Sequence, residues 1–580
     1  MADRNVDWEK CAEEDCIGVL LPTGGKCWAH ASEQDLDMAL KRFGEDGRID
    51  ARGVPITKEL LQRLLAAAPK NDHGQPVLTN PRFDKATLEG KTTLKSGPGF
   101  YGTVFKGTAG FFGATFEGTA SFGGVTFEGD AGFIGATFEG TAAFHRATFK
   151  GDAWFEGGTF KSEARFVEAR FQEEADFDRA IFHGDAWFTR ARANRGAYFV
   201  GATFHHARQL GPILVRKSLV LDGAVFHERA QIQVAAAAVC CRQARFLAGV
   251  QLRARFAEIV LDNADLAAPS LLTGAAGFVG LDEDRWALEV TRLRATTSHG
   301  LMVETPDFPF MVIQDLYGPG GAMPEVILAE QPRLLSVRGA DVAGLTIANT
   351  NLRACVFAGA YHLDQLRIEG CEFAVAPGGW RWTTRKTIAE EHRWRQTPRT
   401  IRSRAKPLAW YRPPHRPPAW LKVEGRIIGL EAGQIANLYR ALRKGREDAK
   451  DEPGAADFYY GEMEMRRHDR DTPRAERLVL WLYWLVAGYG LRAWRALAAF
   501  AVVIGLVGVC FSRVGFHHPH PSLVASWLYA LQATVSLEGK ARQLAGQLTL
   551  PGELLRVGLR LTGPVLLGLA VLSIRGRIKR

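Results

Sequence analysis

The chain has few cysteines and none of the common motifs of enzyme active sites. Eight cysteines in 580 residues are too sparse for a scaffold held together by disulfides. The sequence contains no G-x-S-x-G, no H-E-x-x-H and no phosphate-binding loop. The segment TGGKC is not such a loop, because Leu20 stands where glycine is needed and Cys27 where serine or threonine is needed. We therefore expect no enzymatic activity.

The N-terminus lacks a long apolar run. Its first residues, MADRNVDWEKCAEEDC, contain no hydrophobic segment of a secretory signal. We therefore expect the N-terminus to stay in the cytoplasm. The length of 580 residues exceeds what one hydrophobic core organises, so several domains are expected.

The middle of the chain has no excess of positive or negative charge, whereas a later segment has an excess of positive charge. Residues 83–233 contain 17 Lys and Arg against 17 Asp and Glu. Residues 380–426 contain 13 Lys and Arg against three Glu, which equals the whole net charge of +10. A basic segment with interleaved aromatic residues is typical of contact with anionic lipid or nucleic acid, and a solvated linker is the third interpretation.

Phenylalanine is abundant and recurs at alternating steps of six and five residues. The ladder consists of Phe105, Phe111, Phe116, Phe122, Phe127, Phe133, Phe138, Phe144, Phe149, Phe155, Phe160, Phe166, Phe171, Phe177, Phe182 and Phe188. A period near 5.5 fits neither an α-helix nor a coiled coil. In the repeated Ala-x-Phe both side chains point to one side of an extended segment, and the glycine that often follows permits a corner. Each Phe is buried only if further coils stack above and below it, which predicts a β-solenoid.

The ladder continues in a weaker form to residue 275 and resumes over residues 337–376. These segments resemble pentapeptide repeats, and NADLA around Leu266, GADVA around Val342 and NTNLR around Leu352 are similar to the usual A(D/N)LXX form. The resemblance implies a mainly β fold, a right-handed quadrilateral β-helix. With four faces per coil, residues 83–232 predict about seven coils and a rod of roughly 33 Å at about 4.8 Å per coil.

A C-x4-C-x10-C-x2-H pattern lies near the N-terminus. Its four potential metal ligands are Cys11, Cys16, Cys27 and His30. Three thiolates and an imidazole at short spacings suit tetrahedral zinc, which would hold together a segment too small for its own core. Gly24 and Gly25 fit a knuckle turn, and the full ligand set predicts a structural site. The alternative is a tail with unpaired cysteines.

Long apolar runs occur only near the C-terminus. Residues 496–511 form one, and residues 561–574 form another that reaches spanning length only if residues 554–560 are included. Flanking Trp and Arg residues favour a membrane over the alternative, a buried hairpin of a soluble domain. The positive-inside rule places both ends in the cytoplasm. We expect a two-span protein of a bacterial inner membrane.

The segment between the two runs, SWLYALQATVSLEGK, resembles the pore helix and filter of a potassium channel. Thr534, Ser536 and Glu538 would face the pore of an oligomer. Ser536 and Leu537 stand where the filter has Gly-Tyr, so the segment departs from the carbonyl-lined geometry that selects potassium. An ion-channel-like subunit is therefore the alternative to a membrane anchor.

Two further segments precede the apolar runs. The first, residues 377–430, is predicted to contact anionic lipid or the end of the solenoid. Its candidates for lipid contact are Arg393, Arg395, Arg402 and Arg404. The second, residues 431–470, is expected to form a helical hairpin and resembles a segment of other membrane-attached bacterial pentapeptide-repeat proteins. Glu462 and Glu464 are expected to be ordinary core and surface residues of this hairpin and not catalytic residues.

The predicted parts follow one another along the chain in a simple order. They are a zinc knuckle (1–40), a helical linker and solenoid cap (41–82), repeats (83–275), an insertion (276–336), resumed repeats (337–376), a basic linker (377–430), a helical hairpin (431–472) and a two-span membrane domain (473–580). The sequence predicts a non-enzymatic scaffold or sensor whose solenoid docks another macromolecule at the membrane, and a subunit of a homo-oligomeric pore is the alternative. The neutral repeats differ from the acidic repeat rods that imitate DNA, so nucleic acid is not the expected partner.

Overall fold

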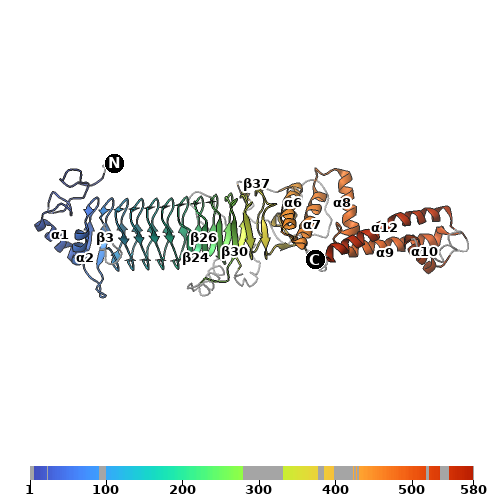
Figure 1. Cartoon of the computed structure of the whole chain (residues 1–580), viewed down its shortest axis with the longest axis horizontal. Coiled ribbons are helices and arrows are strands. Elements are labelled where there is room, and N and C mark those ends of the chain that lie inside the picture. The colour runs from blue at the N-terminus through green and yellow to red at the C-terminus, as the bar shows by residue number, and fades with distance from the viewer. Residues whose placement is uncertain are drawn as a thin grey trace. The chain divides into compact units, whose positions relative to one another are not determined.

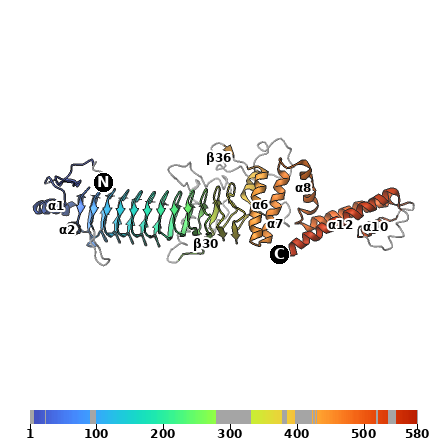
Figure 2. The same ribbon diagram turned by 45° about the horizontal axis from the view of Figure 1, so that its top comes forward.

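The computed structural model describes two compact units of the chain. The described residues are 6–22, 24–89, 99–278, 331–376, 385–396, 422–423, 426–427, 430–517, 521–535 and 548–578. The first unit comprises Met1–Pro377 and Ile388–Gly429, and the second comprises Gly378–Thr387 and Leu430–Arg580. Figures 1 and 2 show the first unit as a stack of parallel strands and the second as a group of helices.

Each regular coil of the first unit consists of four short strands joined by tight corners. These strands are β3 (Val77–Arg82), β4 (Thr87–Leu88), β5 (Val104–Lys106), β6 (Ala109–Gly110), β7 (Thr115–Phe116), β8 (Ala120–Ser121), β9 (Thr126–Phe127), β10 (Ala131–Gly132), β11 (Thr137–Phe138), β12 (Ala142–Ala143), β13 (Thr148–Phe149), β14 (Ala153–Trp154), β15 (Thr159–Phe160), β16 (Ala164–Arg165), β17 (Arg170–Phe171), β18 (Ala175–Asp176), β19 (Ile181–Phe182), β20 (Ala186–Trp187), β21 (Arg192–Ala193), β22 (Ala197–Tyr198) and β23 (Thr203–Phe204). Ala131 pairs in parallel with Ala153, and the three other strand columns keep the same spacing of 22 residues. Two steps of five and two of six add up to this coil, as the Phe ladder predicts.

The Phe side chains fill the interior in columns. Phe111, Phe133 and Phe155 stack with ring centroids 4.8 Å apart and parallel planes. Rings of neighbouring columns meet edge to face, as Phe144 and Phe155 do at 5.3 Å. Phe149 and Phe155 are fully buried. The prediction that the ladder faces inward is therefore confirmed.

The glycines that follow the Phe residues serve two different purposes. Gly135 lies at a corner with φ of 66°, a region that favours glycine. Gly140 does not adopt a positive φ, but a Cβ atom there would lie 2.6 Å from the carbonyl carbon of Gly118 in the preceding coil. Arg146 takes the corner conformation at φ of 56°, so glycine is preferred at corners but not required. The close stacking of coils therefore explains glycines that corner geometry alone does not.

The coil shortens from 22 to 20 residues in the later part of the solenoid. Val225 pairs with Arg245, and Leu219 pairs with Val239. The strands of this part are β24 (Gln209–Val220), β25 (Val225–Phe226), β26 (Ala230–Cys240), β27 (Arg245–Phe246), β28 (Val250–Arg255), β29 (Glu258–Val260), β30 (Ser270–Gly274), β31 (Arg333–Ser336), β32 (Leu345–Ala348), β33 (Arg367–Glu369) and β34 (Ala374–Val375). The strands β24 and β26 continue through what is a corner in the earlier coils.

The solenoid extends beyond its predicted borders at two places. β1 (Arg48–Asp50) pairs with β3, and β2 (Pro55–Ile56) pairs with β4, so the first strands lie within the predicted linker and cap. β31 pairs with β29 and begins before residue 337, the predicted start of the second repeat block. Ile49 and Leu334 fill the interior at these places. Neither stands in an Ala-x-Phe pattern, so the ladder did not extend to them.

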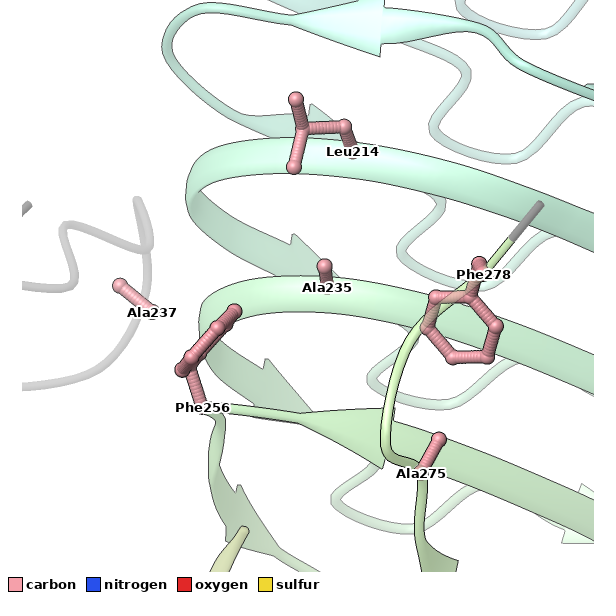
Figure 3. Close-up of a cluster of buried hydrophobic side chains, with 6 residues drawn as sticks. All are labelled: Leu214, Ala235, Ala237, Phe256, Ala275 and Phe278. Atoms are coloured by element: carbon pink, nitrogen blue, oxygen red, sulfur yellow. The ribbon is translucent and has the colours of Figure 1, made fainter. Parts of the chain in front are cut away.

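A second apolar cluster lies on the opposite side of the long strands from the solenoid interior. Its buried members are Leu214, Ala235, Ala237, Phe256, Ala275 and Phe278 (Figure 3). Leu214 and Ala235 alternate along their strands with the interior residues Val215 and Ala236, so their side chains point outward. Phe256 adopts φ of 63°, and the guanidinium of Arg255 lies over its ring at 4.5 Å from the centroid.

Helices lie at both ends of the solenoid unit. α1 (Glu33–Asp46) begins at the N-cap Ser32, whose side chain accepts from the Asp35 N–H, and ends at Gly47. α2 (Lys58–Ala67) begins at the N-cap Thr57, and α4 (Ala389–Gln396) lies beyond the last described repeats. β36 (Lys422–Val423) and β37 (Arg426–Ile427) form an antiparallel pair.

The described residues of the second unit are mainly helical, with β35 (Lys386–Thr387) and an isolated antiparallel bridge between Phe516 and Leu548. Its helices are α6 (Ala432–Asp448), α7 (Glu452–His468), α8 (Arg474–Ala487), α9 (Ala493–Cys510), the π-helical turn η3 (Phe511–Gly515), α10 (Leu523–Val535) and α12 (Leu550–Ile578). The structure therefore forms the expected hairpin from α6 and α7. Ile435 and Phe458 are fully buried between them. α8 was not foreseen as a separate helix.

Candidate functional site

The four predicted metal ligands come together in the loops that precede α1. The ligand atoms of Cys11, Cys16, Cys27 and His30 all lie within 4.8 Å of one another. A hydrogen bond from the Cys11 N–H to the Gly18 carbonyl, 2.8 Å long, closes the first turn. The His30 N–H donates to the Cys27 carbonyl at 3.1 Å, so the Cys-x-x-His segment winds into a turn that aims both side chains at one point.

The distances within the cluster fit a tetrahedral zinc ion. The Sγ atoms of Cys16 and Cys27 are 3.8 Å apart, and His30 Nδ1 is 3.5 Å from the Sγ atoms of Cys11 and of Cys27. Bond lengths of about 2.3 Å to sulfur and about 2.0–2.1 Å to nitrogen place tetrahedral ligands about 3.8 and about 3.6 Å apart. The cluster could therefore bind a metal ion.

Backbone groups support the sulfur atoms. The Gly18 N–H lies 3.4 Å from the Cys16 Sγ, and the Cys27 N–H lies 3.4 Å from the Cys11 Sγ. A Cβ atom on Gly18 would approach the Cys27 Cβ and Sγ to 3.0 Å, so this position has little room for a side chain. Such donors stabilise thiolates, which are the form that binds metal.

The three thiols differ in acidity. Burial raises the pKa of Cys11, but N–H donors of Glu13 and Cys27 and the His30 side chain outweigh it, so that this pKa falls to about 7. Burial raises the pKa of Cys27 to about 12 and also raises that of Cys16. A divalent cation would supply the positive charge that favours all three thiolates.

The cluster is joined to the first coil of the solenoid. Trp28 Nε1 donates to the Asp50 carbonyl at 2.8 Å, and the Val19 N–H donates to the Arg52 carbonyl at 2.8 Å. The Arg52 guanidinium lies 4.7 Å from the centroid of the Trp8 ring. The knuckle thus lies against the strand that ends at Asp50, where it can protect the open end of the solenoid.

Two of the four candidates for lipid contact lie on α4. Arg393 donates to the Ala354 carbonyl at 3.2 Å, at the C-terminal end of the solenoid, and Arg395 donates to Glu391 at 2.7 Å. These contacts agree with the expectation that residues 377–430 contact the end of the solenoid. Arg402 and Arg404 lie outside the described residues.

Glu390 on the same helix accepts hydrogen bonds from backbone N–H groups of the last described repeats. Its Oε1 accepts from the N–H groups of Phe357 and Ala358, the latter at 3.0 Å. Burial raises the pKa of Glu390, and burial lowers the pKa of Arg393 to about 10 despite the opposing effect of the Glu390 charge. α4 therefore closes the end of the solenoid with a buried carboxyl group and a half-buried guanidinium.

One of the three pore candidates, Thr534, lies in the last turn of α10. The Thr534 side chain is buried, its Oγ1 donates to the Ala530 carbonyl at 2.7 Å, and its methyl group packs against Gly563 of α12. Trp527 Nε1 donates to the Gly505 carbonyl of α9 at 3.2 Å. α10 therefore packs on both long apolar helices. Ser536 and Glu538 lie outside the described residues.

Two helices have the length and composition of membrane spans. They are Ala493–Gly515, 23 residues long, and Leu550–Val571, 22 residues long. At about 1.5 Å per residue either one would cross a hydrocarbon core of about 30 Å. The second begins before the apolar run seen in the sequence and includes Arg556, which lies 3.5 Å from Glu553. By length and composition alone, this remains weak support for a membrane location.

Buried charges in α7 were not recognised from the sequence. Glu464 is 7% exposed, accepts from Arg467 at 2.8 Å and accepts from the Tyr489 hydroxyl at 3.2 Å. Glu462 is 2% exposed and accepts from Arg440 at 3.1 Å. The spacing of Glu464 and Arg467 on one helix face was the available signal, but burial depends on α6 and on Tyr489.

Comparison with known proteins identifies the regular part of the solenoid. Residues 75–137, 133–181 and 166–208 match the family described as Pentapeptide repeats (9 copies). No curated protein and no solved structure matches the chain. The matched residues include those in which the four strand columns keep the 22-residue register. This part of the chain thus consists of pentapeptide repeats that form a Phe-rich β-solenoid.

Proposed function

We propose that this protein is a non-enzymatic scaffold or sensor, anchored in a bacterial inner membrane, whose solenoid docks another protein on the cytoplasmic side. The observation that carries the proposal is the exposure of apolar side chains along both span-length helices. Only 11% of the first apolar window and 22% of the second are buried within the chain. A core helix of a soluble protein buries most of such a window, whereas a bilayer would cover these side chains.

The residues around the spans support an orientation. Trp481 and Leu478 on α8 are exposed, and Arg474 and Arg477 lie at the start of the same helix. An apolar surface next to arginines suits the boundary between headgroups and acyl chains. Further arginines and lysines follow the second span in the sequence RGRIKR. By the positive-inside rule both ends then lie in the cytoplasm.

The solenoid suits docking of a protein rather than of nucleic acid. Its regular part has balanced charge, and ion pairs link neighbouring coils, as Lys150–Glu128 at 3.2 Å and Lys161–Glu139 at 2.8 Å do. Interlocked Phe columns make the rod stiff, so a docked partner would be held at a defined place.

In this proposal the right-handed rod presents the surface and the Cys3His cluster holds a structural zinc ion. The basic linker contacts anionic lipid beyond α4.

A subunit of an oligomeric pore is the second candidate. It is supported by α10, a short helix that packs between the two span-length helices as a re-entrant helix would. Two spans cannot enclose a channel by themselves, so symmetry would have to supply the rest. Thr534 is enclosed by α12 within one chain, which favours the anchor over the pore.

Membrane integration tests the main proposal. The full chain and a version that ends at residue 470 would be expressed in bacteria, and the membranes would be extracted at alkaline pH. We expect the full chain to remain in the membrane pellet and the shortened chain to be released. Release of the folded full chain into the soluble fraction would refute the anchor.

Oligomeric state and ion flux separate the two candidates. Native mass measurement in nanodiscs shows how many chains assemble, and current across bilayers shows conduction. A monomer without current is the result expected for an anchor. A tetramer or pentamer whose ion preference changes with Glu538→Lys would establish the pore instead.

A further inference from the structure

Three histidines occur in the sequence at the spacing of one solenoid coil. His183, His205 and His227 are separated by 22 residues, and each directly follows a strand, β19, β23 or β25. Those strands belong to one column, because Ile181 pairs with Thr203 and β23 pairs with β25. Parallel in-register stacking therefore places the three imidazoles above one another on the outer surface.

The three rings form a stacked column. The centroids of His183 and His205 are 4.8 Å apart with planes 1° from parallel, and those of His205 and His227 are 4.6 Å apart with planes 19° from parallel. The backbone holds this register, because the His205 N–H donates to the Phe182 carbonyl at 2.9 Å and the His227 N–H donates to the Phe204 carbonyl at 3.0 Å. The outer two side chains are exposed and the central one is half-buried.

The ring nitrogens of this column have no partner among the described residues. Neighbouring charges are already paired with one another: Lys161 in the preceding coil binds Glu139, and Glu228 binds His206 and Arg208. Burial lowers the pKa of His205, and the charges of His227 and His183 lower it further. A neutral imidazole with a free lone pair is the form that binds metal.

We propose that His183, His205 and His227 form a binding site for one divalent transition-metal ion such as Ni²⁺, Cu²⁺ or Zn²⁺, held by His205 and one of its two neighbours. Imidazole pairs suit these metals. Metal–nitrogen bonds of about 2.0–2.1 Å require the two nitrogens to lie within about 4.2 Å. Rotation of an exposed outer ring towards His205 would bring one of its nitrogens within that separation.

The column geometry determines the stoichiometry. His183 and His227 are two coils apart and cannot share an ion. Both possible pairs use His205, and a ring nitrogen has one lone pair and so binds one ion at a time. The column therefore binds a single ion in two alternative positions. This inference does not depend on the membrane anchor or on the N-terminal cluster.

Ni²⁺ titration of the purified full chain, with its N-terminal cluster preloaded with Zn²⁺, tests the site by calorimetry at pH 7.5. We expect His205→Gln to lose about one equivalent of bound Ni²⁺ relative to the parent. Either His183→Gln or His227→Gln keeps that equivalent with about a twofold weaker association constant, because one of two equivalent positions is lost. The double variant His183→Gln/His227→Gln loses it completely. Acidification to pH 5.5 also removes it, since protons compete for the imidazoles.

His206→Gln is the matched control. This residue adjoins His205 in the sequence, but its Nδ1 lies 3.0 Å from Glu228, so its loss leaves Ni²⁺ binding unchanged. Circular dichroism and thermal melting without metal verify that each variant keeps the solenoid. Equal Ni²⁺ binding by the parent and by folded His205→Gln would overturn the proposal, as would full binding by the double outer variant.

Discussion

At the scale of single residues, the solenoid is stabilised by the stacking of identical side chains in successive coils. A ring in one coil has a parallel ring about one coil rise above and another below. Phe149 lies 4.9 Å from Phe127 and 4.8 Å from Phe171, measured between ring centroids. The same stacking is unfavourable where like charges meet on the outside, as the carboxylates of Asp176 and Asp178 do.

Loss of one interior ring should therefore be costly. Phe149→Ala is expected to lower the free energy of unfolding by about 3–5 kcal/mol, because it removes a buried ring and leaves a cavity between two coils. Phe149→Asp should cost more, since a buried charge has no partner there. Urea unfolding followed by circular dichroism measures both. The control Lys150→Ala changes an exposed neighbour and should cost less than about 1 kcal/mol. Wild-type stability of folded Phe149→Asp would show that the ladder does not face inward.

The acidic residue Asp178 should make the solenoid sensitive to pH. Burial, together with the charge of Asp176, raises the pKa of Asp178 to about 6 in the folded chain, above its ordinary value of 3.8. The folded state therefore binds this proton more tightly than the unfolded state. The contribution of this bound proton to the stability of the folded state is complete below about pH 4 and is lost as the pH rises through 6.

The substitution Asp178→Asn removes this dependence of stability on pH. The asparagine side-chain oxygen can still accept a hydrogen bond from the Val200 N–H, whose nitrogen lies 2.7 Å from the Asp178 carboxylate. We expect the variant to be more stable than the parent at pH 7.5 and to differ little from it at pH 4. Thermal melting over this pH range measures the difference. Parallel stability curves for the two proteins would contradict the assigned pKa.

At the scale of elements, the two ends of the solenoid are the places that need protection. A stack of coils leaves unpaired N–H and C=O groups at its first and last coil, where another chain can pair. The Cys3His knuckle lies against the first coil through Trp28 and Arg52. At the other end Glu390 accepts from the backbone of Phe357 and Ala358. Both ends are closed by polar contacts that a repeat pattern does not contain.

Metal removal should loosen the N-terminal end first. Metal analysis of the purified full chain is expected to give about one equivalent of zinc, which Cys11→Ser/Cys27→Ser removes. Hydrogen exchange at Val19 and in β1 should then accelerate, because the knuckle no longer holds Trp28 against the Asp50 carbonyl. Cys510→Ser, at an exposed cysteine far along the sequence, is the control and should retain the metal. Well-folded wild type without zinc would eliminate the site.

At the scale of the whole molecule, the chain joins a stiff repeat unit to a helical unit with two span-length helices. The first unit can present a docking surface, and the second can hold it at a bilayer. The buried carboxylates of Glu462 and Glu464 link α6, α7 and Tyr489, which precedes the first span, through ion pairs and a hydrogen bond. In the proposed function, transmission between docking and membrane passes through this assembly.

Replacement of the spans separates an anchor from a pore. If residues 496–580 are exchanged for two unrelated spans of the same orientation, an anchor keeps its membrane location and the docking activity of its solenoid. A pore loses ion flux in the same exchange. Fractionation of cells and bilayer currents measure the two properties on the parent and the exchanged protein. Loss of membrane docking in a correctly inserted exchange protein would count against a simple anchor.

Sequence periodicity alone determined the solenoid, its 22-residue coil and the inward direction of the Phe ladder, because each repeat has only one way to bury its ring. Local spacing likewise sufficed to predict the Cys11, Cys16, Cys27 and His30 cluster and the hairpin of α6 and α7. Only the tertiary structure decided what depends on stacking or packing between distant residues. Examples are the shift to 20-residue coils, the close approach of Gly140 to Gly118 and the burial of Glu390. These features arise between coils and elements, so no local pattern encodes them.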